Sequence, residues 1–119
     1  MTLIALRANN MSKTLDQLTQ EVIAIFTDYE KQGTKPWNYK SALNDLPYQL
    51  GSLAKRVNQL EGYRYREGLS DEELNNYIAD ELADMIAEVL FIAHDMRIDI
   101  NRAWEKMIES DHQKINQRS

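Results

Sequence analysis

The chain has 119 residues, of which 43% are hydrophobic and 28% are charged, and its formal net charge is −5. This composition excludes an intrinsically disordered chain, and the length fits one domain. Lysine and arginine are scattered without a basic stripe, so DNA and RNA are not expected as partners. The absence of cysteine excludes disulfides, thiolate nucleophiles and cysteine zinc sites, and it fits a cytoplasmic location.

Residues 1–11 are expected to form an N-terminal arm, either poorly ordered or docked on a partner, and residues 12–119 a single helical domain. The apolar run in the arm is far too short for a signal-peptide core or a membrane span, so no membrane partner is expected. Met1 and Met11 are both candidates for the true start, since Met11 stands just ahead of a helix signal.

Apolar residues at steps of three and four predict a first helix over residues 12–31, which Gly33 and Pro36 end. Pro47 interrupts a second apolar set. Because proline has no N–H and clashes with the preceding turn, this helix is expected to begin near Asp45 or to kink at the proline. The second set keeps the same steps up to Gly62 and comprises Leu43, Leu46, Leu50, Leu53, Val57 and Leu60.

Ser70 and Glu73 form a capping box, which satisfies free N–H groups at a helix start, and they predict a long third helix that runs to about Arg97. Asp99 is the expected cap of a fourth helix, which frays into the polar tail of residues 110–119. The inward face predicted for this fourth helix comprises Ile100, Ala103, Trp104, Met107 and Ile108.

No segment shows sustained two-residue alternation, and the connections are short. The expected fold is therefore all-α, an antiparallel bundle of four helices. Three longer helices and a short one make a thin core for a single copy, and apolar helices of this kind often complete their burial against a second copy. We therefore expect a homo-oligomer, either a homo-dimer or a homo-tetramer.

Glu81, Asp84 and Glu88 recur at helical spacing along the third helix, beside its apolar stripe rather than opposite it. Carboxylates clustered at a core boundary repel one another unless a cation or a basic side chain lies between them. Mg²⁺, which prefers oxygen ligands, would remove this repulsion. The alternative is that these residues are solvated and form ordinary ion pairs on the helix surface.

The segment "DELADMIAEVLFIAHDMRIDINRAWEKM" resembles the second metal-binding helix and the following turn of the MazG-like, all-α nucleoside triphosphate pyrophosphohydrolases. An E-x-x-D pair, an apolar run, an "ID" loop and a helix with a small and apolar face stand in the expected order. They are Glu81 with Asp84, residues 89–93, Ile98 with Asp99, and Ala103 with Trp104. Upstream, "PWN" and "LGSLAKRV" resemble the entry to the first metal helix, so the resemblance covers residues 36–118.

The resemblance implies that Mg²⁺ bridges the carboxylates and a nucleoside triphosphate, and that an activated water attacks the α-phosphorus. The products would be a nucleoside monophosphate and pyrophosphate. Metal charge offsets the charge on the phosphate oxygens and lowers the pKa of bound water.

The first metal helix departs from the family pattern, which has E-E-x-x-E where this chain has Tyr48, Gln49 and Ser52. None of the three is acidic, and Arg56 adds a cation on the same face, where it is a candidate for substrate binding. Two hypotheses therefore stand. Either the chain is an unusual or weak Mg²⁺-dependent pyrophosphohydrolase, or it is an inactive bundle that binds a nucleotide or another protein. Asp45, the nearest upstream acid, lies about one turn from Gln49 and is a candidate to replace a missing ligand, but an aspartate just before Pro47 is far more often a helix cap.

Other candidates are weighed against ordinary structural roles. Lys106, Lys114 and Arg118 fall near the place where the resembling family carries phosphate-contacting basic residues, although most such charges are simply solvated. Trp37 is a candidate for stacking on a nucleobase or for the core. The remaining candidates, expected to be structural, solvated or surface-turn residues, are His94, His112, Tyr63 and Tyr65.

Overall fold

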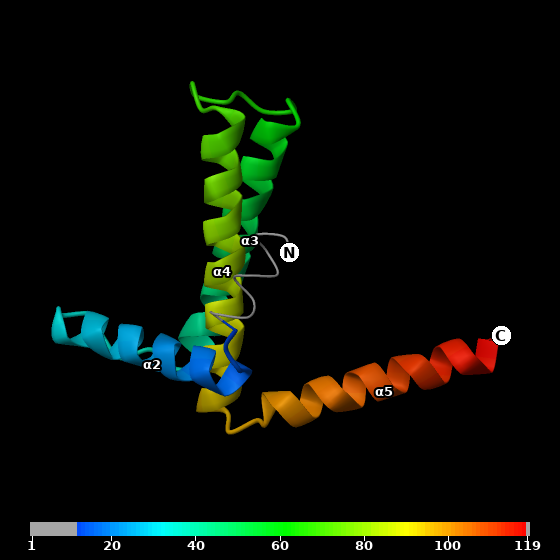
Figure 1. The fold of residues 1–119 in the computed structure, drawn as a ribbon. Helices are drawn as coiled ribbons and strands as arrows, with labels where there is room; N and C mark the ends of the chain where they lie inside the picture. The colour runs from blue at the N-terminus through cyan, green and yellow to red at the C-terminus, as the bar shows by residue number, and fades with distance from the viewer. Residues whose placement is uncertain (1–11, 119) are drawn as a thin grey trace.

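The computed structural model describes residues 12–118, in which there are four helices and no strand (Figure 1). The all-α prediction is therefore confirmed for these residues. The predicted arm over residues 1–11, and the choice between Met1 and Met11 as the start, lie outside the described residues. In chain order the helices are α2 (Leu15–Lys31), α3 (Tyr39–Leu60), α4 (Asp71–Asp95) and α5 (Ile100–Arg118).

Local capping sets the start of each of the four helices in residues 12–118. The Ser70 side chain accepts from the Glu73 N–H and Glu73 reciprocates, so the capping box predicted for α4 is confirmed. An equivalent box forms at Thr14, which places the start of α2 at Leu15 rather than at Ser12. Asp99 caps α5 as expected, since its carboxylate accepts from the Arg102 N–H.

The start predicted for α3 is wrong. The helix begins at Tyr39, because the Asn38 side chain accepts from two N–H groups of the first turn, and it continues through Pro47. The Tyr39 N–H also donates to Asp95 Oδ2, 2.7 Å away, which ties this end of α3 to the last turn of α4. Asp45 is therefore a residue of the helix body and not its cap.

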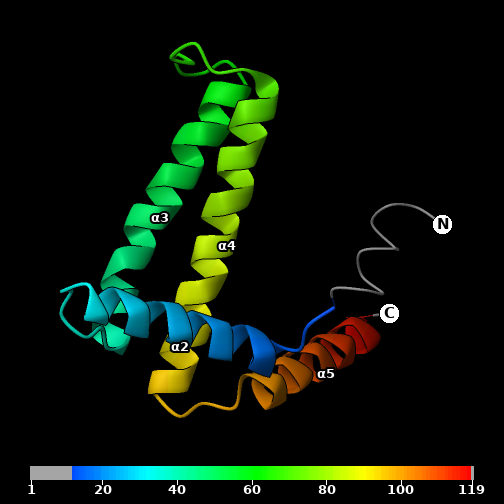
Figure 2. The ribbon, with the colours of Figure 1, turned by 60° about the vertical axis from the view of Figure 1, so that its left-hand side comes forward.

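Helices α3 and α4 form a long antiparallel hairpin, and α2 crosses it near the end opposite the connecting loop (Figures 1 and 2). Phe26 of α2 packs on Phe91 of α4 with ring centroids 4.7 Å apart, and on Trp37 at 5.4 Å. The buried apolar residues of the described chain are few and lie mostly at this crossing. They are Ala42, Leu74, Leu90, Phe91 and Ala93.

Helix α5 extends away from the hairpin instead of packing on it (Figures 1 and 2). The chain turns after α4 with Arg97 at a φ of 57° and with the Ile98 N–H bonded to the Ala93 carbonyl, and this turn directs α5 outward. The predicted inward face is wrong for a single copy: no residue of α5 is buried, and Trp104 is 57% exposed. The predicted fraying is also wrong, because the helix continues to Arg118.

None of the helices in residues 12–118 combines the length and apolar character needed to cross a membrane.

Candidate functional site

The contact between α3 and α4 contains a line of polar side chains, here called the polar seam. On α3 these residues recur at steps of four and three, which places them on one face of the helix. The α4 side carries the predicted acidic stripe. The polar seam comprises Asp45, Gln49, Ser52, Arg56 and Gln59 of α3, and Glu81, Asp84 and Glu88 of α4.

Two contacts fix the register of the seam. The Ser52 hydroxyl lies close enough to the Glu81 carboxylate to oppose the rise in its pKa, and Asp45 lies against Glu88. The two contacts are seven residues apart on each helix, or about two turns, so they are in register across an antiparallel pair. Gln49 and Asp84 fall between them and line the same pocket. The acidic stripe of α4 thus lies opposite Gln49 and Ser52. These are two of the three positions at which the resembling family carries glutamates.

Glu88 is the most deeply buried acid of the seam, with 4% of its surface exposed. No N–H or O–H of the described residues donates to either of its carboxylate oxygens. Burial raises the pKa of Glu88 to about 7, with further contributions from its contact with Asp45 and from the charges of Asp45 and Asp84. Ionised carboxylates only accept, so a hydrogen bond between Glu88 and Asp45 requires a proton on one of them.

The two other acids of the stripe differ in their partners. Burial, followed by the neighbouring charges of Asp80 and Asp45, raises the pKa of Asp84. The pKa of Glu81 is also raised, by burial and then by Asp84 and Asp80, but Arg56 and the Ser52 hydroxyl oppose the shift. The Glu81 end of the seam is thus partly neutralised by a cation.

Arg56 occupies the seam as predicted from its place one turn after Ser52. Its guanidinium lies over the Tyr77 ring, 4.1 Å from the centroid, and donates to the Gln59 side-chain oxygen at 3.2 Å. These contacts hold the positive charge near Glu81.

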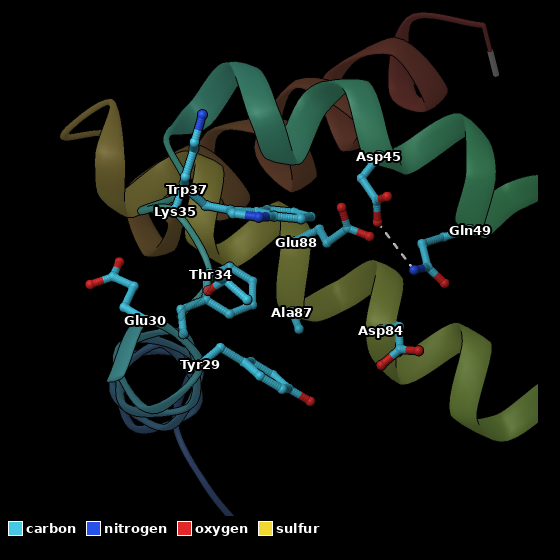
Figure 3. A pocket seen from close by; sticks show the side chains of 11 residues that line it. Tyr29, Glu30, Thr34, Lys35, Trp37, Asp45, Gln49, Asp84, Ala87 and Glu88 are labelled. Carbon is cyan, nitrogen blue, oxygen red and sulfur yellow. Dashed lines mark hydrogen bonds between the residues drawn. The ribbon is translucent and has the colours of Figure 1, made fainter. Parts of the chain in front are cut away.

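An open cavity of about 330 Å³ lies beside the acidic end of the seam (Figure 3). The acids and Gln49 form one wall, and aromatic rings from α2 and the following loop form the other. Trp37 is thus brought to the site, although it also packs on Phe26. The cavity is lined by Phe26, Tyr29, Glu30, Thr34, Lys35, Trp37, Asp45, Gln49, Asp84, Ala87 and Glu88.

The sequence favours a capping role for Asp45 over a ligand role, whereas the structure places Asp45 in this site. Asp45 faces Glu88 and accepts from the Gln49 amide at 3.2 Å. It stands four residues before Gln49, so a helix drawn through Pro47 places both on one face. Phe26 and Tyr29 fall on the apolar period that predicts the first helix, which indicates a packing face and not a site, and Lys35 carried no signal.

Several predicted residues are not brought to the cavity. Lys106, Lys114, Arg118 and His112 are on α5, and among the described residues that line the cavity none comes from α5. Tyr63 and Tyr65 are exposed in the loop at the far end of the hairpin (Figure 1). Tyr48 is 69% exposed and does not line the cavity, and His94 lies in the last turn of α4 beside Asp16.

Residues 12–118 contain no group of three or more histidine, cysteine, aspartate or glutamate side chains arranged to hold a metal ion. Within the seam, the carboxylates of Asp45 and Glu88 lie against each other. Mg²⁺ is commonly bound by one or two carboxylates together with waters and substrate phosphates, so a pair of carboxylates beside an open cavity fits this ion. Comparisons of the chain with protein-family models, with curated proteins and with solved structures found no match.

Proposed function

We propose that this chain is a MazG-like bundle that binds a nucleoside triphosphate with Mg²⁺ and hydrolyses it weakly to the monophosphate and pyrophosphate. The observation that carries the proposal is Glu88, a buried carboxylate with no donor among the described residues, at the wall of an open cavity that also holds Asp84. The sequence resemblance over residues 36–118 supports the reaction class, and the lack of cysteine supports a cytoplasmic setting.

In this proposal the acidic stripe holds the ion, with Glu81, Asp84 and Glu88 as its candidate ligands. Mg²⁺, when bound, would neutralise phosphate charge and lower the pKa of a coordinated water. The chain contributes the rest of the site. Asp84 and Glu88 attract the ion, and the Trp37 ring across the cavity offers a face on which a nucleobase stacks.

An alternative, a nucleotide-binding or protein-binding bundle without catalysis, is favoured by the other end of the seam. Gln49 and Ser52 supply no charge, and the Arg56 guanidinium opposes the rise in the pKa of Glu81, as a metal ion would. A guanidinium in place of an ion would leave a folded seam without the multi-metal centre that hydrolysis uses.

Pyrophosphate release from a panel of NTPs and dNTPs at high Mg²⁺ distinguishes the hydrolase from the bundle without catalysis. We expect Mg²⁺-dependent release that Glu81→Ala and Asp84→Ala each reduce by at least about tenfold, because each removes a negative charge from the acidic stripe that attracts the ion. Asp80→Ala is the matched control, since Asp80 is an exposed acid on the same helix outside the cavity.

Absence of turnover across the panel at high enzyme concentration would reject the hydrolase. The alternative would then predict binding of a non-hydrolysable triphosphate in calorimetry without release of product.

We also propose that the chain assembles into a homo-oligomer, a dimer or a tetramer, and so completes the bundle. Its accessible surface is 9472 Å², whereas a compact chain of this mass exposes about 6,700 Å². The surplus is on the scale of an obligate interface. Exposed apolar residues form a stripe on one side of the hairpin and a second on α5. The stripe on the hairpin consists of Leu43, Leu50 and Val57 of α3 with Leu82, Ile86 and Val89 of α4. The stripe on α5 consists of Trp104, Met107, Ile108 and Ile115.

Substituting Leu50→Glu together with Val89→Glu is expected to reduce the solution mass to that of a single copy, because both charges fall on the exposed apolar stripe of the hairpin. Sedimentation equilibrium gives the mass. Tyr63→Ser, in the loop at the far end, is the control and should leave the oligomer intact. A natural protein that is monomeric at its highest soluble concentration would contradict the proposal.

A further inference from the structure

The two ends of the polar seam differ in charge balance. At the Glu81 end, Arg56 and the Ser52 hydroxyl offset negative charge. At the other end, Asp45 and Asp84 are the charges that act on Glu88, and both are negative. None of the ion pairs formed by residues 12–118 includes Asp45, Asp84 or Glu88. The unbalanced charge is therefore concentrated between Asp45 and Glu88.

Glu88 supplies a second and independent observation. Its side chain is almost fully buried, and both oxygens lack a donor among the described residues. Figure 3 shows its carboxylate directed toward Asp45 across the seam. A carboxylate buried without a partner is strongly unfavourable, so this position requires either a cation or a proton.

We propose that a divalent cation of the Mg²⁺ and Mn²⁺ class binds between Asp45 and Glu88, about two turns along the seam from Ser52 and Glu81, without requiring a nucleotide. Two carboxylates suit such an ion, and waters from the open cavity complete its coordination. Asp84 adds negative charge from one turn away. The carboxylate of Asp45, within the helix body, thus replaces part of the charge missing at Gln49 and Ser52.

Gln49 gives this site an adaptable ligand. Its amide now donates to Asp45 at 3.2 Å. Rotation of the amide presents the carbonyl oxygen instead, which is a neutral ligand for a hard cation. The inference deepens the proposed function, because it rests on the same cavity, but ion binding does not depend on turnover.

The test uses the full chain with metal alone: Mg²⁺ by calorimetry and Mn²⁺ by electron paramagnetic resonance, without nucleotide. We expect one ion per chain, and we expect Asp45→Asn and Glu88→Gln each to weaken binding by at least about tenfold. Asp80→Asn removes the same charge from an exposed position near Asp84 and is expected to weaken binding by less than about threefold. Both test substitutions keep side-chain shape, and circular dichroism reports folding. If Asp45→Asn does not fold, Glu88→Gln carries the test.

No metal binding by the natural protein, or equal weakening in Asp80→Asn and Asp45→Asn, would overturn the inference. Pyrophosphate release, measured separately, distinguishes it from the proposed function. Binding that depends on Asp45 and Glu88 without any turnover would reject the hydrolase and keep the metal site. Turnover together with metal binding that is unchanged in Asp45→Asn would reject this metal site and keep the hydrolase.

Discussion

At about pH 8, Glu88→Gln is expected to raise the free energy of unfolding by about 3 kcal/mol, measured without divalent ions. The pKa of Glu88 is about 7 in the folded chain, against an ordinary value of 4.5. Between these values the folded state binds more protons than the unfolded state, so the free energy of unfolding falls as pH rises. The stability that comes from the protonated Glu88 carboxyl is fully present below about pH 4.5 and is lost above about pH 7. The amide stays neutral throughout and removes this loss.

Urea denaturation followed by circular dichroism, at fixed protein concentration over this pH range, measures the effect. The raised pKa values of Glu81 and Asp84 act in the same direction, so Glu88→Gln is expected to flatten the pH dependence without abolishing it. Asp80→Asn, which changes an exposed acid of the same helix, should leave most of the dependence in place. A Glu88→Gln variant no more stable than the natural protein at about pH 8 would mean that the ionised carboxylate already has a favourable partner.

Addition of Mg²⁺ at about pH 8 extends this experiment to the proposed cation. An ion that binds only the folded state stabilises it by mass action, so the natural protein should gain stability and Glu88→Gln should gain little. Equal gains in both would place the ion elsewhere.

The helices were predictable from sequence because their signals are local. The box at Ser70 and Glu73 and the cap at Asp99 act within one turn, and the structure has both. The start of α3 was not predictable in this way. Pro47 alone suggests a start near Asp45, but the cap at Asn38 and the bond from Tyr39 to Asp95, far apart in sequence, extend the helix upstream.

The acidic stripe of the polar seam was predictable from the sequence, whereas the place of Asp45 in the seam was not. Helical spacing places Glu81, Asp84 and Glu88 on one edge, and antiparallel pairing then sets them against Gln49 and Ser52. The capping role favoured for Asp45 is wrong because α3 continues through the proline, which places Asp45 in the helix body. The direction of α5 was missed for a different reason. Periodicity identifies an apolar face such as that of Trp104, but it does not say whether the face packs within one copy or on another.

Placing acids on α3 opposite the acidic stripe is the second change with a large expected effect. Gln49→Glu combined with Ser52→Glu should raise the affinity for Mg²⁺ on the order of 100-fold, because two more carboxylates face the acidic stripe across the seam. Without metal the same variant should be less stable than the natural protein, since it adds negative charge beside Glu81 and Asp84. Calorimetry with Mg²⁺ and thermal unfolding with and without the ion measure the two effects.

Tyr48→Glu is the matched control for this variant. Tyr48 is the remaining position where the resemblance leads one to expect an acid, but it is exposed and does not line the cavity. A carboxylate there is screened by solvent and should change the affinity for Mg²⁺ by less than about threefold. If Tyr48→Glu strengthens binding as much as the double variant does, net charge rather than the seam controls the ion.

The single substitutions should contribute unequally. A glutamate at position 52 stands four residues before Arg56 on one helix face, the spacing at which an acid and a base pair, so part of its charge is spent on the guanidinium. A glutamate at position 49 stands between Asp45 and Asp84, where no cationic partner is recorded among the described residues. Gln49→Glu alone should therefore give most of the gain in affinity. A larger gain from Ser52→Glu would mean that the ion binds at the Glu81 end, beside Arg56, and that the charge balance assigned to the two ends of the seam is wrong.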